Sequence, residues 1–284
     1  PDEKVLINTP AYGYFLHAAE YNNLDVLLSP LKRGDDGHFT VDYEDFEARC
    51  ADPKCKVVFW CNPHNPTGRV WTEEELRRVA EIVSRYNLWL ISDEIHCDLT
   101  RTGVRHIPMA KLMPGYRKLI TCMAPTKTFN MAGLAFSNII LRDPATRAGF
   151  RDRDKLFGMV NTLSLTAAKA AYDLGGPWLA ELRAYLDGNF AFVHDFLARE
   201  LPEAVSYVPQ ATYLAWVDPS RCLPGLEDLP GFFANEAGVL LEGGDGLFVG
   251  NAAGYVRLNL AMPRATLETG LERMRDAIRR YNEK

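Results

Sequence analysis

The chain has 284 residues, 47% of them hydrophobic and 11% aromatic, which is enough for a sizeable core in one large or two modest domains. Its formal net charge of −5 comes from interspersed acidic and basic residues, so we expect neither a nucleic-acid-binding surface nor a disordered charged tail. No apolar run has the length of a membrane span, and no charged start precedes an apolar stretch, so we expect no membrane partner and no signal peptide.

The first predicted element is the strand-like stretch Val5–Ile7, which comes almost directly after Pro1. Because the chain lacks an initiator methionine and enters a strand so early, we expect it to be N-terminally incomplete. Four later apolar runs have strand length and are typical of strands buried on both faces of a sheet. These runs are Lys56–Cys61, Leu88–Ser92, Lys118–Met123 and Phe136–Leu141.

A helix is predicted between the first two of these runs. Thr72 is its expected N-cap, and Glu75 lies three residues later, where it completes a capping box. One face of the helix is apolar and contains Leu76, Val79, Ala80, Val83 and Tyr86. Strand, helix and strand in succession predict a parallel βαβ unit.

The pattern changes after about residue 170. Gly175–Pro177 breaks the chain before a long amphipathic helix that we expect to link two domains, with an apolar face of Trp178, Leu182, Tyr185, Val193 and Leu197. Shorter strands are then predicted at Ser206–Val208, Tyr213–Val217, Val239–Leu241 and Tyr255–Leu260. A closing helix has its apolar face at Leu267, Leu271, Met274 and Ile278. We therefore predict a large domain over residues 1–175 and a small α+β domain over residues 176–284.

The six cysteines form no CxxC pair and have no regular spacing; they are Cys50, Cys55, Cys61, Cys97, Cys122 and Cys222. Such a pattern is typical of reduced thiols, not of a disulfide framework or a zinc site. We expect a cytoplasmic protein without a metal.

Polar residues come directly after three of the predicted parallel strands, at Asn62–Gly68, Asp93–His96 and Ala124–Asn130. In an open parallel sheet, ligands bind beyond the carboxyl ends of the strands, so these segments are the first candidates for a site. Each segment alone has an ordinary alternative: a turn before a helix, a helix cap at Asp93, or a solvated lysine at Lys127. Their convergence favours a site.

These segments read NPHNPTG, SDEIH and APTKTFNMAGL, and in this order and spacing they resemble the fold-type I enzymes that depend on pyridoxal 5'-phosphate (PLP). The SDEIH form, the KTFNMAGL continuation and the segment Pro209–Trp216 are similar to the MalY/PatB-type carbon-sulfur β-lyases. The resemblance covers essentially the whole chain. It implies an α/β fold of the aspartate aminotransferase type, with a mostly parallel sheet in the large domain, and a homodimer. It also implies an earlier segment, with a phosphate-binding loop and a tyrosine donated across the dimer.

The resemblance assigns roles around the cofactor. Lys127 would carry PLP as a Schiff base and then act as the base that removes the substrate's Cα proton. Asp93 would pair with the pyridine nitrogen and keep it protonated. Asn65 would bind the phenolic oxygen, and His96 stands where many aminotransferases have a tyrosine for that oxygen. For His96 the alternative is a hydrogen-bonded histidine near a strand end.

Three further residues complete the expected site. Tyr12 matches the aromatic residue that stacks on the cofactor ring, with an ordinary core aromatic as the alternative. Thr126 is placed to donate a hydrogen bond to the cofactor phosphate. Arg257, in Val256–Asn259, would bind the substrate α-carboxylate in a two-pronged ion pair. The phosphate-binding arginine of many aminotransferases is absent after the lysine, where this chain has Gly133–Phe136, as in the lyase-like subgroup.

The first hypothesis for function is therefore a PLP-dependent carbon-sulfur β-lyase that converts cystathionine or a related S-substituted cysteine to a thiol, pyruvate and ammonia. An aminotransferase on the same scaffold is the second hypothesis. A third is that the chain is no enzyme by itself, but a cofactor-poor fragment or a regulatory or binding protein.

Overall fold

The computed structural model describes residues 2–154 and 160–283. Its largest sheet has six strands in the order β3-β1-β6-β7-β8-β9, parallel except for β9, which runs antiparallel to β8. The predicted α/β class with a mostly parallel sheet is confirmed. The strands of this sheet are β1 (Lys4–Thr9), β3 (Asp25–Pro30), β6 (Cys55–Cys61), β7 (Trp89–Asp93), β8 (Leu119–Met123) and β9 (Asn138–Leu141).

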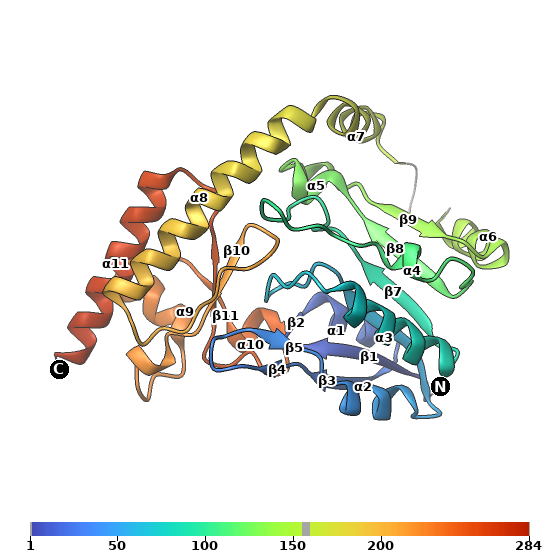
Figure 1. Cartoon of the computed structure of the whole chain (residues 1–284), viewed down its shortest axis with the longest axis horizontal. Coiled ribbons are helices and arrows are strands. Elements are labelled where there is room, and N and C mark those ends of the chain that lie inside the picture. The colour runs from blue at the N-terminus through green and yellow to red at the C-terminus, as the bar shows by residue number, and fades with distance from the viewer. Residues whose placement is uncertain (1, 155–159, 284) are drawn as a thin grey trace.

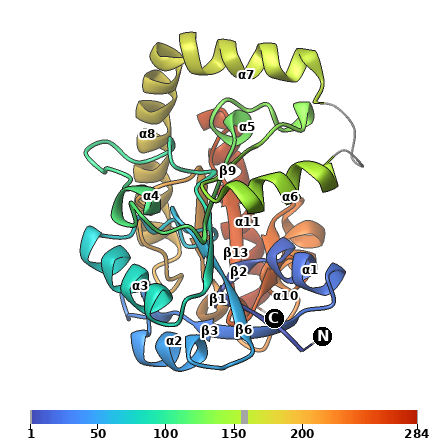
Figure 2. The same ribbon diagram turned by 90° about the vertical axis from the view of Figure 1, so that its right-hand side faces the viewer.

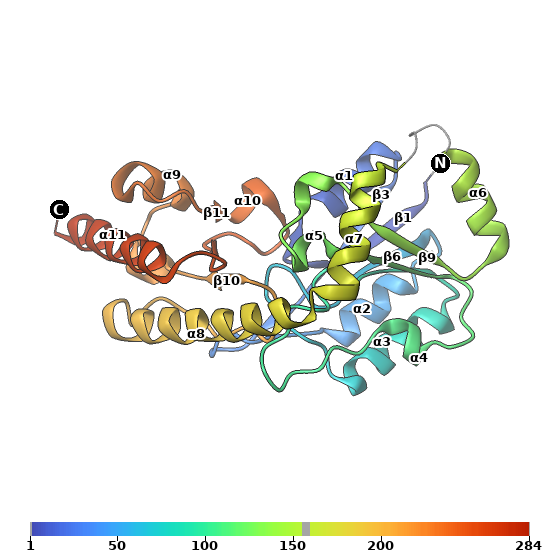
Figure 3. The ribbon, with the colours of Figure 1, turned by 90° about the horizontal axis from the view of Figure 1, so that it is seen from above.

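Helices cover both faces of this sheet (Figures 2 and 3). On one face lie α2 (Tyr43–Cys50), α3 (Glu73–Arg85) and α4 (Met109–Leu112), and on the other lie α1 (Tyr14–Tyr21) and α6 (Pro144–Asp154). Trp60, Phe46 and Leu76 are fully buried where the first three helices pack on the strands. The strands are therefore apolar on both sides, which is why they read as continuous apolar runs.

The helix α3 forms as its sequence predicts. The Thr72 hydroxyl accepts from the backbone N–H of Glu75 at 3.2 Å, and the Glu75 carboxylate accepts from the Thr72 N–H at 2.7 Å. Leu76, Val79 and Val83 are buried against the sheet. Since α3 connects the adjacent parallel strands β6 and β7, the βαβ unit is confirmed.

The C-terminal part is built on a second, antiparallel sheet and two long helices (Figure 1). The sheet has the order β10-β13-β11, with β10 (Leu214–Val217), β13 (Val256–Asn259) and β11 (Glu242–Gly243). The helices α8 (Gly176–Glu200) and α11 (Arg264–Asn282) pack on each other and share a core with this sheet. The predicted closing helix is confirmed, with all four of its apolar residues buried.

The remaining elements are short or lie between these two parts. The other strands are β2 (Ala11–Tyr12), β4 (Lys32–Arg33), β5 (Phe39–Thr40) and β12 (Phe248–Val249), and the other α-helices are α5 (Pro125–Thr128), α7 (Thr162–Leu174), α9 (Leu229–Phe232) and α10 (Gly244–Leu247). Pairing of β12 with β2 joins the C-terminal part to the start of the chain. No helix within the described residues is both long and apolar enough to cross a membrane.

A glycine fixes a second junction between the two parts. Gly68 has φ +67°, and its carbonyl accepts from the backbone N–H groups of Gln210 and Ala211, both at 3.0 Å. A Cβ at position 68 would lie 2.3 Å from the Pro209 Cβ. Only glycine fits this close approach at a left-handed φ, and the contact holds the segment before β10 against the loop after β6.

Two predicted strands are wrong. Around Ser206–Val208 only an isolated bridge forms, between Val205 and Asp218, because the Tyr207 side chain turns toward Thr67 and donates to its carbonyl. The segment Val239–Leu241 is irregular, and Leu240 is 89% exposed. There the chain leaves a π-helical turn through Gly238 at φ +62° and joins the sheet only at β11.

The long helix is confirmed, but part of its predicted buried face is wrong. Trp178 and Tyr185 are 47% and 45% exposed, whereas Val193 and Leu197 are buried as expected. The fully buried stripe begins at Leu186, because the earlier turns of α8 reach the core of the C-terminal part only through the partly buried Leu179 and Leu182. The division of the chain at residue 175 coincides with the break between α7 and α8, and as a domain boundary it stays a prediction.

We expect Thr72→Ala to lower the free energy of unfolding by about 1 kcal/mol, because the first turn of α3 then loses its capping hydroxyl. Urea denaturation measures this loss. The matched control is Thr166→Ala, an exposed threonine whose hydroxyl bonds only to the Thr162 carbonyl of its own helix. Its expected effect is within about 0.5 kcal/mol, and equal losses in the two variants would contradict a capping role for Thr72.

Candidate functional site

A cavity of about 340 Å³ lies at the carboxyl ends of β6 and β7, facing β10, β11 and β13. Six of the seven residues predicted from the sequence line it: Tyr12, Asn65, Asp93, His96, Lys127 and Arg257. The seventh, Thr126, is buried in the first turn of α5 and is not among the lining residues. The predicted residues thus bring one amine, one carboxylate, one imidazole and one guanidinium to a single cavity, and Glu242 adds a second carboxylate.

Asp93 and Lys127 lie at the carboxyl ends of two neighbouring strands, β7 and β8. Asp93 is the last residue of β7, and Lys127 lies in α5, directly after β8. Burial raises the pKa of the Asp93 carboxyl to about 6, although a hydrogen bond from the Ile95 backbone N–H at 3.1 Å and the charge of Lys127 favour the ionised form. A cation bound beside Asp93 would relieve this cost.

His96 is buried and its Nδ1 has no hydrogen-bond partner among the described residues. This nitrogen gives no support to the alternative of a hydrogen-bonded histidine, and the role of His96 stays a prediction. Burial lowers its pKa to about 3, helped by the positive charges of Lys127 and Arg257, so the ring is neutral at physiological pH. His96 is among the residues that line the cavity, and a neutral imidazole there can exchange a hydrogen bond with a polar group of a ligand.

Arg257 is held by two partners. Its Nη1 donates to the Asn65 Oδ1 at 2.8 Å, and its Nε donates to the Glu242 Oε2 at 2.7 Å. Its Nη2 also donates to that same Glu242 oxygen. The Tyr12 ring centroid lies 5.9 Å from the guanidinium carbon, so the aromatic residue and the arginine form adjacent walls.

Sequence reasoning missed several lining residues, among them Phe15, Tyr213, Glu242 and Asn259. Tyr213 and Asn259 lie inside segments that were recognised. Asn259 comes two residues after Arg257 on β13 and therefore lies on the same face, and Tyr213 directly precedes β10. Glu242 had no such indication, because its position depends on pairing between β11 and β13, where it lies opposite Arg257.

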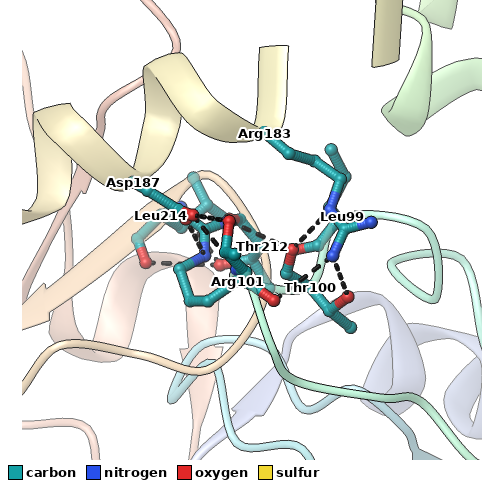
Figure 4. Close-up of polar contacts among 8 residues, drawn as sticks. Leu99, Thr100, Arg101, Arg183, Asp187, Thr212 and Leu214 are labelled. Atoms are coloured by element: carbon teal, nitrogen blue, oxygen red, sulfur yellow. Dashed lines mark hydrogen bonds and ion pairs between the residues drawn. The ribbon is translucent and has the colours of Figure 1, made fainter. Parts of the chain in front are cut away.

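A polar cluster holds the loop after His96 against α8 and the start of β10 (Figure 4). Arg183 donates to the carbonyls of Thr100 and Arg101 at 2.7 and 3.2 Å, and Asp187 accepts from the Thr102 N–H at 3.0 Å. Arg101 in turn donates to the Leu99 carbonyl at 3.1 Å and to the Thr212 carbonyl. We call this set the Arg101 cluster.

The Arg101 cluster holds a strained residue next to the cavity. Thr212 has φ +73°, a conformation that costs a β-branched residue on the order of 1–3 kcal/mol. Its N–H donates to the Leu99 carbonyl at 2.9 Å, and its carbonyl accepts from Arg101. The next residue is Tyr213, whose ring packs edge-on against His96 at 5.9 Å. The cluster thus fixes the direction from which Tyr213 enters the cavity.

Comparisons with known proteins agree with these observations. The family model for class I and II aminotransferases matches residues 1–274. The chain is 39% identical to the cystathionine beta-lyase PatB of Bacillus subtilis (strain 168), over 98% of the chain and 72% of the relative, and 36% identical to the protein MalY of Escherichia coli (strain K12), over 98% and 71%. The crystal structure of the PLP-bound C-S lyase from Staphylococcus hominis matches with a TM-score of 0.94 and 44% identity, over 98% of this chain and 71% of that one.

Asp93→Asn should change the dependence of stability on pH. Since the folded-state pKa of about 6 lies above the ordinary value of 3.8, ionised Asp93 destabilises the fold, and stability falls as pH rises from about 4 to about 6. The difference between these two pKa values of Asp93 corresponds to a loss of about 3 kcal/mol in the free energy of unfolding, at about 1.4 kcal/mol per pKa unit.

For the cofactor-free protein we therefore expect Asp93→Asn to be more stable than the wild type at pH 8, by on the order of 1–3 kcal/mol, and nearly equal to it at pH 4. Urea unfolding of both proteins at the two pH values measures this. A difference that does not change with pH would contradict the raised pKa of Asp93.

Arg101→Lys should lower the free energy of unfolding by about 1–3 kcal/mol, because a lysine lacks the planar guanidinium that lies over the Phe190 ring, 4.3 Å from its centroid, and whose Nη2 donates to the carbonyls of both Leu99 and Thr212. The control is Arg105→Lys, an exposed arginine four residues later on the same loop, with an expected change within about 0.5 kcal/mol. Urea denaturation compares the two. Equal effects would mean that Arg101 does not hold the strained turn.

Proposed function

The chain belongs to the class I and II aminotransferase family, and we propose that within this family it is a PLP-dependent carbon-sulfur β-lyase. The substrate is cystathionine or a related S-substituted cysteine, and the products are a thiol, pyruvate and ammonia. The observation that carries the proposal is the meeting of Lys127, Asp93 and Arg257 in one cavity. The relatives named above support the lyase assignment.

The residues of the cavity fit PLP. The Asp93 carboxyl, with its raised pKa, suits a cationic partner such as a protonated pyridine nitrogen. The neutral His96 imidazole, which lines the cavity, suits a polar group on the same ring. Lys127 supplies the amine that bonds to an aldehyde. We assign these roles as part of the proposal, with Asn65 beside the phenolic oxygen and Tyr12 against the ring face.

When bound, PLP supplies an electron sink for the substrate's Cα. Lys127 then acts as the base: its Nζ takes the Cα proton, the bond between Cβ and sulfur breaks, and the sulfur leaves as a thiolate. His96, whose pKa is lowered to about 3 by burial, is too weak a base to take that proton in place of Lys127. Arg257 orients the substrate by its α-carboxylate, which places the Cα proton toward Lys127. Thr126, outside the lining residues, is assigned to the cofactor phosphate by resemblance only.

An aminotransferase remains the second candidate, because both reactions begin with removal of the Cα proton. The two reactions differ in their second half: a lyase loses the β-substituent, whereas an aminotransferase returns the proton and releases a keto acid. The absence of an arginine in Gly133–Phe136 is a feature shared with the lyase-like subgroup. A regulatory or binding protein would not need the complete set of Lys127, Asp93 and Arg257.

We further propose a homodimer in the cytoplasm. Large apolar side chains are exposed on α1 and α7 and suit a second copy of the chain; they are Tyr14, Tyr21, Leu163, Leu165, Tyr172 and Leu174. All six cysteines are free thiols, and four of them are buried, which is typical of proteins in a reducing compartment.

The test is an absorbance titration with PLP, and then a pyruvate assay with cystathionine, on the wild type and on Lys127→Ala. We expect a visible absorbance band and pyruvate release in the wild type, and loss of the band with a drop in rate of about 10²- to 10⁴-fold in Lys127→Ala. The control is Lys169→Ala, an exposed lysine on α7 paired with Asp173, which should behave as the wild type.

Each contrary result has its own meaning. A band that bleaches with cystathionine while no pyruvate forms would favour the aminotransferase. Pyruvate release that persists in Lys127→Ala would contradict the role of this lysine. No band in the wild type would mean that the chain does not bind the cofactor by itself, in agreement with a non-enzymatic role.

A further inference from the structure

The guanidinium of Arg257 already holds a carboxylate, and that carboxylate belongs to the chain itself. The Glu242 Oε2 accepts from Nε at 2.7 Å and also from Nη2, so one edge of the guanidinium is occupied. The Asn65 Oδ1 takes a hydrogen bond from Nη1 at 2.8 Å. One Glu242 oxygen thus takes both N–H groups along one edge of the guanidinium, and these are the charge-assisted contacts that a carboxylate of a ligand would need.

The two partners differ in how firmly they are fixed. The Arg257 side chain is only 7% exposed and lies on β13, in the middle of its sheet. It also lies over the Phe248 ring, 4.9 Å from the ring centroid. The Glu242 side chain is 52% exposed and lies on the two-residue edge strand β11. When a ligand competes for the guanidinium, Glu242 is the side chain that can move away.

Glu242 also lies in the wall of the cavity, in contact with the space that a ligand enters. A ligand's carboxylate that approaches Arg257 meets a guanidinium whose charge is neutralised and whose Nε and Nη2 already donate to another oxygen. When the ligand binds, its carboxylate replaces the carboxylate of Glu242. The free energy gained is therefore only the difference between the ion pair of Arg257 with the ligand and its ion pair with Glu242.

We propose that Glu242 is an internal competitor for Arg257 that sets the affinity of the site for the substrate's α-carboxylate. The inference rests on the proposed function, since it takes Arg257 as the group that receives this carboxylate. Removal of the Glu242 charge should strengthen binding of every ligand that carries a free α-carboxylate. Ligands in which an uncharged amide replaces the carboxylate should bind as before. The same return of Glu242 to Arg257 helps to release a carboxylate product.

The test uses Glu242→Gln in the PLP-loaded protein, with glycine and glycinamide as probes that carry no leaving group. Both contain the α-amine, and only glycine has the carboxylate. Their dissociation constants are obtained from the change in cofactor absorbance. We expect the constant for glycine to fall by about three- to tenfold and the constant for glycinamide to stay the same. The KM for cystathionine should fall in the same variant, as the dissociation constant for glycine does.

The control is Glu73→Gln, which removes the same charge from an exposed ion pair with Arg77 on α3. It should leave both dissociation constants unchanged. An unchanged or raised constant for glycine in Glu242→Gln would overturn the inference, and so would equal falls for glycine and glycinamide. These outcomes are distinct from a failure of the proposed function, in which the wild type would bind PLP and glycine but release no pyruvate from cystathionine.

Discussion

Five parallel strands of the large sheet end at the same edge, and the rest of the site depends on this constraint. A strand buried on both faces can carry polar groups only where it leaves the sheet, so the chemically useful side chains gather beyond the strand ends. Asp93 terminates β7, and the segments with Asn65 and Lys127 come after the strands on either side of it. Three loops far apart in the sequence therefore meet because their strands are neighbours in the sheet. No contact between the side chains of the loops is needed to bring them together.

The cavity combines charges that would be costly if left alone. Asp93 is buried enough for its carboxyl to favour protonation, and His96 is buried enough to stay neutral. Arg257 is buried and satisfied by Glu242 and Asn65. The site thus holds a buried carboxyl that suits a cation, a neutral imidazole and a guanidinium whose partner is exchangeable. A cofactor with a protonated ring nitrogen and an amino acid with a carboxylate offset these costs together.

Much of this arrangement is encoded in local sequence. The apolar runs and the capping box at Thr72 predicted the central strands and α3, because burial on both faces and N-capping leave marks within a few residues. The predicted strand at Val239–Leu241 failed because three apolar residues do not show whether a partner strand is near. The ion pair of Glu242 with Arg257 was missed for the same reason: it depends on register between strands that are separated by a loop. The strain at Thr212 likewise depends on Arg101, which is distant in the sequence.

The two arginines of the Arg101 cluster bind mostly main-chain groups. Arg101 and Arg183 donate to the carbonyls of Leu99, Thr100, Arg101 and Thr212, and the side-chain acceptors that the structure describes in the cluster are the Thr100 hydroxyl and the Asp187 carboxylate. Since every residue type offers the same carbonyl, these hydrogen bonds do not themselves depend on which side chains stand at positions 99 and 212. A fold that fastens its active-site loop in this way can change the shape of its pocket through the neighbouring side chains while its framework stays the same. The same independence from side chains makes the loop a suitable place to begin when the substrate range of such an enzyme is altered by directed evolution.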